Sequence, residues 1–197
     1  MKKLLFLLIS FIPTVTFAQV VTVVETEHFT VGYSEELEQP LWAEYTVLCP
    51  NGTASRSGMD FYEHEEIHTS DDEDYVNNVW DKGHLAPAAA FSCDKEMLRS
   101  TFTYLNSALQ HQSLNRGTWN RLEGFERDLA NFFMVNVRID VIFDENSQVL
   151  ETGATVPSAF RKIIKFDGKT AVFEFPNEEI KGKPWIDFIL PYDHFDH

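Results

Sequence analysis

Three residues in the middle of this chain carry side chains that together could hydrolyse a phosphodiester bond. His84 ends the run Asp81-Lys82-Gly83-His84, and a histidine can take a proton from water near neutral pH. Asn115 follows further along the chain, and its side-chain carbonyl suits a Mg²⁺ ion that keeps most of its waters. Glu123 lies two helical turns beyond Asn115, where a carboxylate can hold those waters. The pattern predicts metal-assisted hydrolysis in which the histidine activates water.

The residues around Asn115 and Glu123 predict a helix that positions both side chains. An apolar stripe at helical spacing indicates a helix from Arg116 to about Asn131. The stripe consists of Trp119, Leu122, Leu129 and Phe133, with Phe125 beside it. A second helix is expected over 95–104, because Asp94 is a good N-cap.

The rest of the chain predicts mainly strands. Apolar and β-branched residues indicate strands over 20–26, 29–33, 42–48, 132–143, 157–166 and 170–175. A polar turn is expected over 34–40, and Asp167-Gly168 indicates a turn between the last two strands. Residues 50–80 form a long polar region, and such regions are usually functional or mobile. These elements predict an α+β domain with a mainly antiparallel sheet.

The first residues of the chain have the pattern of a secretory signal peptide. A basic start, a short apolar run and small residues predict cleavage after Ala18. The chain would then comprise a signal peptide over 1–18 and a single domain over 19–197, with no membrane segment after cleavage. The predicted location is secreted or periplasmic. In an oxidising compartment Cys49 and Cys93 could pair as a disulfide, and two free buried thiols are the alternative.

The charge of the chain is unevenly distributed. The formal net charge is -15, which has the wrong sign for holding nucleic acid by bulk electrostatics. Residues 60–74 contain eight acids and no Lys or Arg, whereas residues 98–122 contain no acid but three arginines, Arg99, Arg116 and Arg121. An anionic backbone could therefore approach the second segment without meeting carboxylates.

The run at His84 and the run that contains Asn115 resemble the DNA/RNA non-specific endonuclease family. The family signature Asp-Arg-Gly-His is matched by Asp81-Lys82-Gly83-His84, followed by Leu85-Ala86-Pro87. A second family element is matched by Asn106, Gln110 and the run Leu114-Asn115-Arg116-Gly117-Thr118-Trp119-Asn120-Arg121-Leu122-Glu123. Weaker matches are Gly32-Tyr33 upstream and Val156-Pro157-Ser158-Ala159-Phe160 with Lys162 downstream.

This resemblance implies a ββα-metal (His-Me finger) nuclease fold and an endonuclease that hydrolyses DNA and RNA with little sequence specificity. It implies that His84 is the general base, that Asn115 is the direct ligand of Mg²⁺, and that Glu123 holds the waters around the ion. Mn²⁺ or another divalent ion could replace Mg²⁺. Arg56 matches a family arginine that contacts phosphate. The resemblance also places further residues in supporting or substrate-binding roles: Asp81, Gly83, Asn106, Gln110 and Arg116.

The chain departs from the family signature at Lys82, which stands where the family has arginine. Lysine keeps the positive charge but lacks the planar fork that can hold two phosphate oxygens. The resemblance therefore implies a catalytic role for Lys82 with weaker positioning of the phosphate.

Two other functions are compatible with parts of the sequence. His64-Glu65-Glu66-Ile67-His68 matches the H-E-x-x-H pattern of zinc metallopeptidases, which requires a helix. The acidic run that follows leaves little apolar face for such a helix. The second alternative is an inactive nuclease-like binding protein. The joint presence of His84, Asn115 and Glu123 argues against it.

Overall fold

A six-stranded antiparallel sheet forms the framework of the protein in the computed structural model, which describes residues 20–191. Its strand order is β1-β2-β3-β6-β7-β8, and every neighbouring pair is antiparallel. The strands are β1 (Thr22–Glu25), β2 (Phe29–Ser34), β3 (Gln39–Thr46), β6 (Asn136–Ile142), β7 (Ala159–Phe166) and β8 (Lys169–Pro176). The predicted signal peptide over 1–18 lies outside the described residues.

One face of this sheet is buried and the other is largely polar. Alternate residues such as Val31, Ala43, Ile139 and Phe160 are fully buried in the core. Their neighbours along the strands point to the opposite face, where Arg138 contacts Glu44 and Asp140, and Arg161 pairs with Glu174 across β7 and β8.

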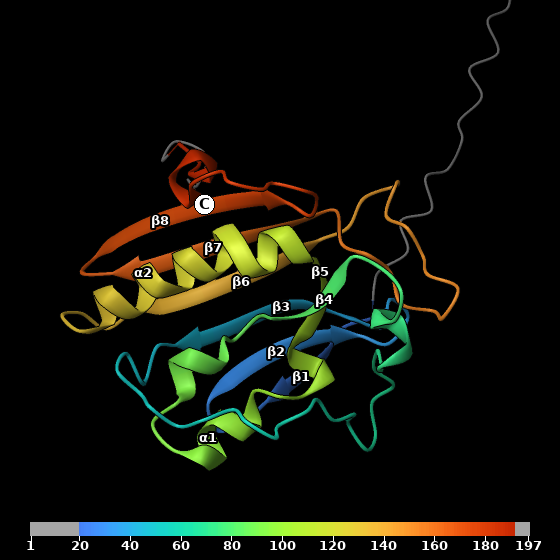
Figure 1. The fold of residues 1–197 in the computed structure, drawn as a ribbon, viewed down its shortest axis with the longest axis horizontal. Coiled ribbons are helices and arrows are strands. Elements are labelled where there is room, and N and C mark those ends of the chain that lie inside the picture. Colours follow the sequence, from blue (N-terminus) through green and yellow to red (C-terminus); the bar gives the residue numbers. More distant parts are fainter. Residues whose placement is uncertain (1–19, 192–197) are drawn as a thin grey trace, which may run out of the picture.

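The buried face is covered by a two-stranded sheet and by the helices (Figure 1). Strand β4 (Trp80–His84) pairs with β5 (Ser107–His111). The short helix α1 (Lys95–Ser100) lies between them in the sequence, and α2 (Asn120–Ala130) follows the π-helical turn η4 (Leu114–Trp119). Trp119 packs edge-on against Phe160 and Phe175, which fixes the start of α2 against β7 and β8.

The structure confirms the predicted α+β class, the six strands of the main sheet and the helix after Asn115. It corrects several boundaries. The helix predicted over 95–104 ends at Ser100, because residues 104–106 form a separate 3₁₀ turn. The strand predicted over 132–143 begins at Asn136, and Phe132 is 80% exposed. Phe133, assigned to the apolar stripe of the helix, is 40% exposed and lies beyond its end.

A disulfide joins Cys49 to Cys93, so the structure favours pairing over two free thiols. The bond connects the segment after β3 to the residue before the N-cap of α1, and it closes a loop across a sequence separation of 44. Loop-closure entropy for such a length corresponds to roughly 4 kcal/mol of stabilisation. The loop it closes contains the long polar region and β4.

Across residues 20–191, none of the helices combines the length and the apolar character that a membrane span requires.

Candidate active site

A pocket of about 500 Å³ brings together the residues that the sequence marked for catalysis. It lies between β4, the beginning of α2 and the polar region that precedes β4. Six predicted site residues line it: Arg56, Lys82, His84, Asn115, Arg116 and Glu123. The sequence therefore identified side chains that are far apart in the chain and adjacent in space.

Strand β4 delivers Lys82 and His84 to this pocket, and Gly83 allows it to pack closely on β5. Gly83 pairs with Ala108, and a Cβ atom added at Gly83 would lie 2.6 Å from both Cβ and Oε1 of Gln110. A larger residue at position 83 would therefore displace either the buried Gln110 or the backbone on which His84 is carried.

Asn106 fixes the chain immediately after His84. The buried Asn106 side chain accepts a hydrogen bond from the backbone N–H of Ala86 at 2.8 Å and donates to the Ala86 carbonyl at 2.9 Å. It also donates to the carbonyl of Thr101. Asn106 and Gln110 lie outside the pocket lining, so their support of the site passes through the backbone of β4 and β5.

The His84 ring lies in an aromatic environment that favours its neutral form. Phe61 and Phe102 lie with their ring centroids 4.8 and 4.9 Å from that of His84. The Nε2 atom is buried and has no hydrogen-bond partner among the described residues. Burial, together with the positive charge of Arg56, lowers the pKa of His84 to about 3. The imidazole is therefore unprotonated over the whole neutral range.

Asp81 orients the two residues that follow the start of η4. Its Oδ2 atom accepts hydrogen bonds at 2.8 Å from Nδ2 of Asn115 and from Nε of Arg116. A third bond, from Arg116 to Oδ1, completes a bidentate ion pair. Because the amide nitrogen of Asn115 donates to Asp81, its carbonyl oxygen remains as the acceptor on the pocket side.

Glu123 lies in the pocket above a buried ion pair. The pKa of Glu123 is raised to about 7, chiefly by burial; the positive charge of Lys162 opposes this rise, and the negative charge of Glu126 adds to it. Lys162 is fully buried and donates to Oε1 of Glu126 at 2.7 Å, and Tyr45 donates to Oε2 at the same distance. The Lys162 ammonium also lies 4.0 Å from the centre of a Trp119 ring.

Lys82 is held by acids from the polar region before β4. Its ammonium contacts the carboxylate of Asp72 and lies 3.6 Å from that of Asp60. The hydroxyl of Tyr104 donates to the same Asp72 oxygen, and hydrogen bonds from Lys82 and Tyr104 lower the pKa of Asp72. The ammonium also lies within 5.4 Å of the ring centres of Phe61 and Tyr104.

Several of these contacts were not predicted from the sequence. The acid cluster over 60–74 was visible, but its position beside Lys82 was not. The aromatic partners of His84 and the charge pair between Glu126 and Lys162 have no local pattern that distinguishes them from ordinary core and helix residues. Lys162 belongs to the weaker downstream match to the family, and this match was the one sequence signal that could have identified its role.

The H-E-x-x-H segment does not form a metallopeptidase site. Residues 64–68 form bends rather than a helix, so the two histidines do not share a helical face. The ring of His64 accepts hydrogen bonds from the backbone of Glu66 and Ile67, and the ring of His68 lies 3.1 Å from Glu38. Within residues 20–191, no group of three or more His, Cys, Asp or Glu side chains could hold a metal ion. This alternative was therefore wrong.

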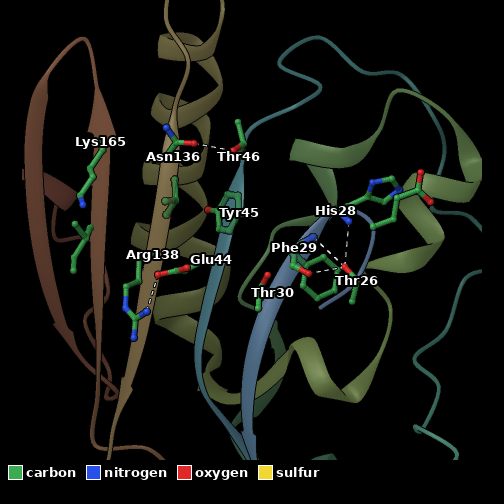
Figure 2. Close-up of a pocket in the computed structure, with 13 residues that line it drawn as sticks. Thr26, His28, Phe29, Thr30, Glu44, Tyr45, Thr46, Asn136, Arg138 and Lys165 are labelled. Atoms are coloured by element: carbon green, nitrogen blue, oxygen red, sulfur yellow. Dashed lines mark hydrogen bonds and ion pairs between the residues drawn. The ribbon is translucent and has the colours of Figure 1, made fainter. Parts of the chain in front are cut away.

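A separate hollow, of about 510 Å³, opens on the polar side of the main sheet and holds none of the predicted site residues. Figure 2 shows Arg138 and Glu44 joined there across β6 and β3, with Thr30 and Lys165 on the flanking strands. No residue of the catalytic pocket reaches this hollow, so we assign the chemistry to the pocket around His84.

Comparisons with known proteins agree with this geometry. A family model described as DNA/RNA non-specific endonuclease matches residues 11–197. Mitochondrial endonuclease G of Bos taurus is 27% identical over 159 residues, which is 73% of this chain and 53% of that protein. The mitochondrial nuclease of Saccharomyces cerevisiae is 27% identical over 201 residues, 85% of this chain and 60% of that protein. The chain thus spans between half and two thirds of the length of these curated relatives.

A solved structure has the same fold. The crystal structure of the EndoG/EndoGI complex superposes with a TM-score of 0.78 and 25% identity, covering 90% of this chain and 83% of that one. The strands β4 and β5 and the helix α2 supply the ββα unit, so the predicted ββα-metal fold is confirmed.

Proposed function

The chain belongs to the DNA/RNA non-specific endonuclease family, and from this premise we propose that it is a metal-dependent endonuclease that hydrolyses phosphodiester bonds in DNA and RNA. The observation that carries the proposal is the shared pocket of His84, Asn115 and Glu123. Hydrolysis of a phosphodiester requires a base for the attacking water and oxygen ligands for a metal ion. His84 provides the base, and Asn115 and Glu123 provide the oxygen ligands. Nothing in this set of groups reads a base edge, which agrees with low sequence specificity.

In the proposed mechanism His84 accepts the proton of the attacking water. With a pKa of about 3, the imidazole is already neutral at any pH at which nucleic acid is stable, so it needs no prior deprotonation. Phe61 and Phe102 hold the ring in place and keep competing water away from it. A positioned base of this kind contributes about 10²- to 10⁴-fold in rate.

The residues opposite His84 fit a divalent cation. The carbonyl oxygen of Asn115 faces the pocket because Asp81 takes its amide nitrogen. Glu123 has a pKa raised to about 7, so nearby positive charge would readily ionise it. Asn115 would hold the ion directly and Glu123 would hold it through water, as hard oxygen donors do for Mg²⁺ or Mn²⁺. When bound, such an ion stabilises the charge that develops on the phosphoryl and leaving oxygens.

Arg56 and Arg116 supply positive charge to the pocket for the scissile phosphate. Arg56 is exposed on the pocket wall, and its charge acts on His84. Arg116 is anchored by Asp81 yet remains 68% exposed, so it can reach an incoming oxygen without losing its anchor. We assign a weaker role to Lys82, because Asp72 and Asp60 already neutralise its charge.

The test is nicking of supercoiled DNA and cleavage of single-stranded RNA by purified protein with Mg²⁺, with and without EDTA. Wild type should cleave both substrates, and His84→Ala should lose at least about a hundredfold in rate while its circular dichroism spectrum stays native. His28→Ala is the matched control, because His28 lines the separate hollow on the open face of the sheet and lies outside the catalytic pocket. Equal rates for wild type and His84→Ala would refute the assignment of the base, and no cleavage by wild type would favour the inactive binding protein.

We further propose that the mature protein begins near Gln19 and works outside the cytoplasm. The signal-peptide pattern of the first eighteen residues supports this, and so does the Cys49–Cys93 disulfide, since such bonds persist in oxidising compartments. N-terminal sequencing of protein recovered from the periplasm or the medium of an expressing culture should read from Gln19. Recovery of an uncleaved chain only from the cytosol would refute this location.

A further inference from the structure

A second hollow adjoins the catalytic pocket at Arg116. This hollow has a volume of about 530 Å³, and Arg116 lines both it and the catalytic pocket. Its other lining includes Arg121 from the first turn of α2, Lys181 from the chain after β8, and His111 at the end of β5. The hollow is therefore next to the catalytic pocket, on the side where Arg116 lies.

The second hollow carries more positive than negative charge, although the chain as a whole is acidic. Arg121 donates to the carbonyl of Lys183 at 2.8 Å and to Oγ1 of Thr118 at 3.1 Å, and these neutral acceptors hold its guanidinium without cancelling its charge. Lys181 is exposed and forms no hydrogen bond or ion pair within residues 20–191. The lining contains one carboxylate, Glu179.

The part of the catalytic pocket around Lys82 has the reverse charge. There the ammonium of Lys82 faces Asp72 and Asp60, whose side chains are 72% and 79% exposed. One cation with two exposed carboxylates leaves a net negative region, which repels a phosphodiester backbone at short range. The two regions together favour passage of a polyanion on the Arg116 side.

We propose that the hollow lined by Arg121 and Lys181 is a binding subsite for the phosphates that flank the scissile bond of the substrate strand. The two residues bind the backbone by charge, so the subsite extends affinity without adding base specificity. This inference rests on the proposed nuclease function. It predicts that the subsite acts on long strands and leaves a single small diester unaffected.

The experiment compares a long single-stranded oligonucleotide with bis-nitrophenyl phosphate, which contains one diester and no flanking phosphates. The variants are Lys181→Gln, Arg121→Gln and their double, with Arg121→Lys as the charge-conserving variant. For the double variant, KM on the oligonucleotide should rise about tenfold. The slope of log KM against log salt concentration should fall by about 0.7 for each lost phosphate contact with a single strand, and therefore by about 1.4 for the two together. Arg121→Lys should retain most of the affinity.

A matched control removes the same charge elsewhere. Lys165 is exposed on β7 beside the hollow on the open face of the sheet, so Lys165→Gln should leave KM and the salt slope at wild-type values (Figure 2). Both kcat and KM on the small diester should be unchanged in every variant.

The remaining outcomes distinguish failure of the nuclease function from failure of the subsite. If wild type cleaves neither substrate, the proposed function fails. If wild type cleaves both and the double variant keeps the wild-type KM and salt slope, the subsite is refuted while the nuclease function stands. The subsite is also refuted if Lys165→Gln has the same effect as the double variant, or if activity on the small diester falls as far as activity on the oligonucleotide.

Discussion

The buried pair of Lys162 and Glu126 gives a prediction whose size follows from the structure. Both side chains are almost completely buried, and their charged atoms lie 2.7 Å apart. Replacing Lys162 by Met keeps most of the volume beside Trp119 but leaves the Glu126 carboxylate with only the hydroxyl of Tyr45 as a partner. Breaking a buried pair in this way costs about 3–5 kcal/mol of folding free energy. For a domain of this size that corresponds to a loss of about 6–20 °C in Tm.

Urea unfolding at neutral pH in EDTA, with the disulfide intact, measures this loss. The variants are Lys162→Met, Glu126→Gln and the double, which form a double-mutant cycle. Each single variant should lose about 3–5 kcal/mol, and the double should lose less than the sum by at least about 2 kcal/mol, because it leaves no buried charge unpaired. A loss below about 1 kcal/mol in Lys162→Met, or additive losses in the double, would refute the reasoning.

The same pair should also affect the catalytic pocket. The positive charge of Lys162 lowers the pKa of Glu123, and the negative charge of Glu126 raises it. Lys162→Met should therefore raise the pKa of Glu123, whereas Glu126→Gln should change it little or lower it. Infrared titration of the carboxyl band in metal-free protein, with Glu123→Gln to identify the band, measures both shifts. Equal pKa values in the two variants would show that the pair acts only on stability.

Three further results are expected at the pocket. Gly83→Ala should destabilise the protein by about 1–3 kcal/mol in urea unfolding, because the added methyl group meets Gln110 at 2.6 Å. Asp72→Asn should lower KM for DNA by up to about fivefold at low salt, since it frees Lys82 from an exposed ion pair, and the difference should vanish at high salt. Below about pH 7 the affinity for Mg²⁺, measured by calorimetry, should fall about tenfold per pH unit, because Glu123 must lose its proton before the ion binds. Glu123→Gln should remove this dependence on pH.

The sequence predicted the site better than it predicted the elements that carry it. His84, Asn115 and Glu123 lie within forty residues of one another in the chain, so a local motif could identify them before any fold was known. Strands β4 and β5 were not predicted. The run from Trp80 to His84 contains charged residues and a glycine rather than an alternating pattern, and every residue of β5 before His111 is buried. Their pairing depends on Gly83 packing on Gln110, which is a contact between distant segments.

The errors at the ends of elements have similar causes. The apolar residues Phe132 to Val135 extend the alternating pattern of β6, but the ladder with β3 runs only from Thr46 back to Trp42, which pair with Asn136 to Asp140. Beyond it a single backbone hydrogen bond joins Val47 to Val135, and β6 begins opposite the residue at which β3 ends. Single-chain periodicity contains no information about where a neighbouring strand ends, so the exposed Phe132 could not have been anticipated.

The origin of each site residue indicates how the work of catalysis is divided within the fold. The groups expected to react come from β4, η4 and α2, with α1 and β5 lying between β4 and η4 in the sequence. Burial is the main cause of the raised pKa of Glu123, and the neighbouring ion pair adjusts that pKa. In this pair Glu126 lies on α2, and Tyr45 on β3 and Lys162 on β7 hold it from the main sheet. A substitution at His84 or Asn115 should therefore remove a group expected to react, whereas a substitution at Lys162 should leave those groups in place and change the pH at which Glu123 ionises. The pH dependence of activity is thus the property through which the main sheet affects the site.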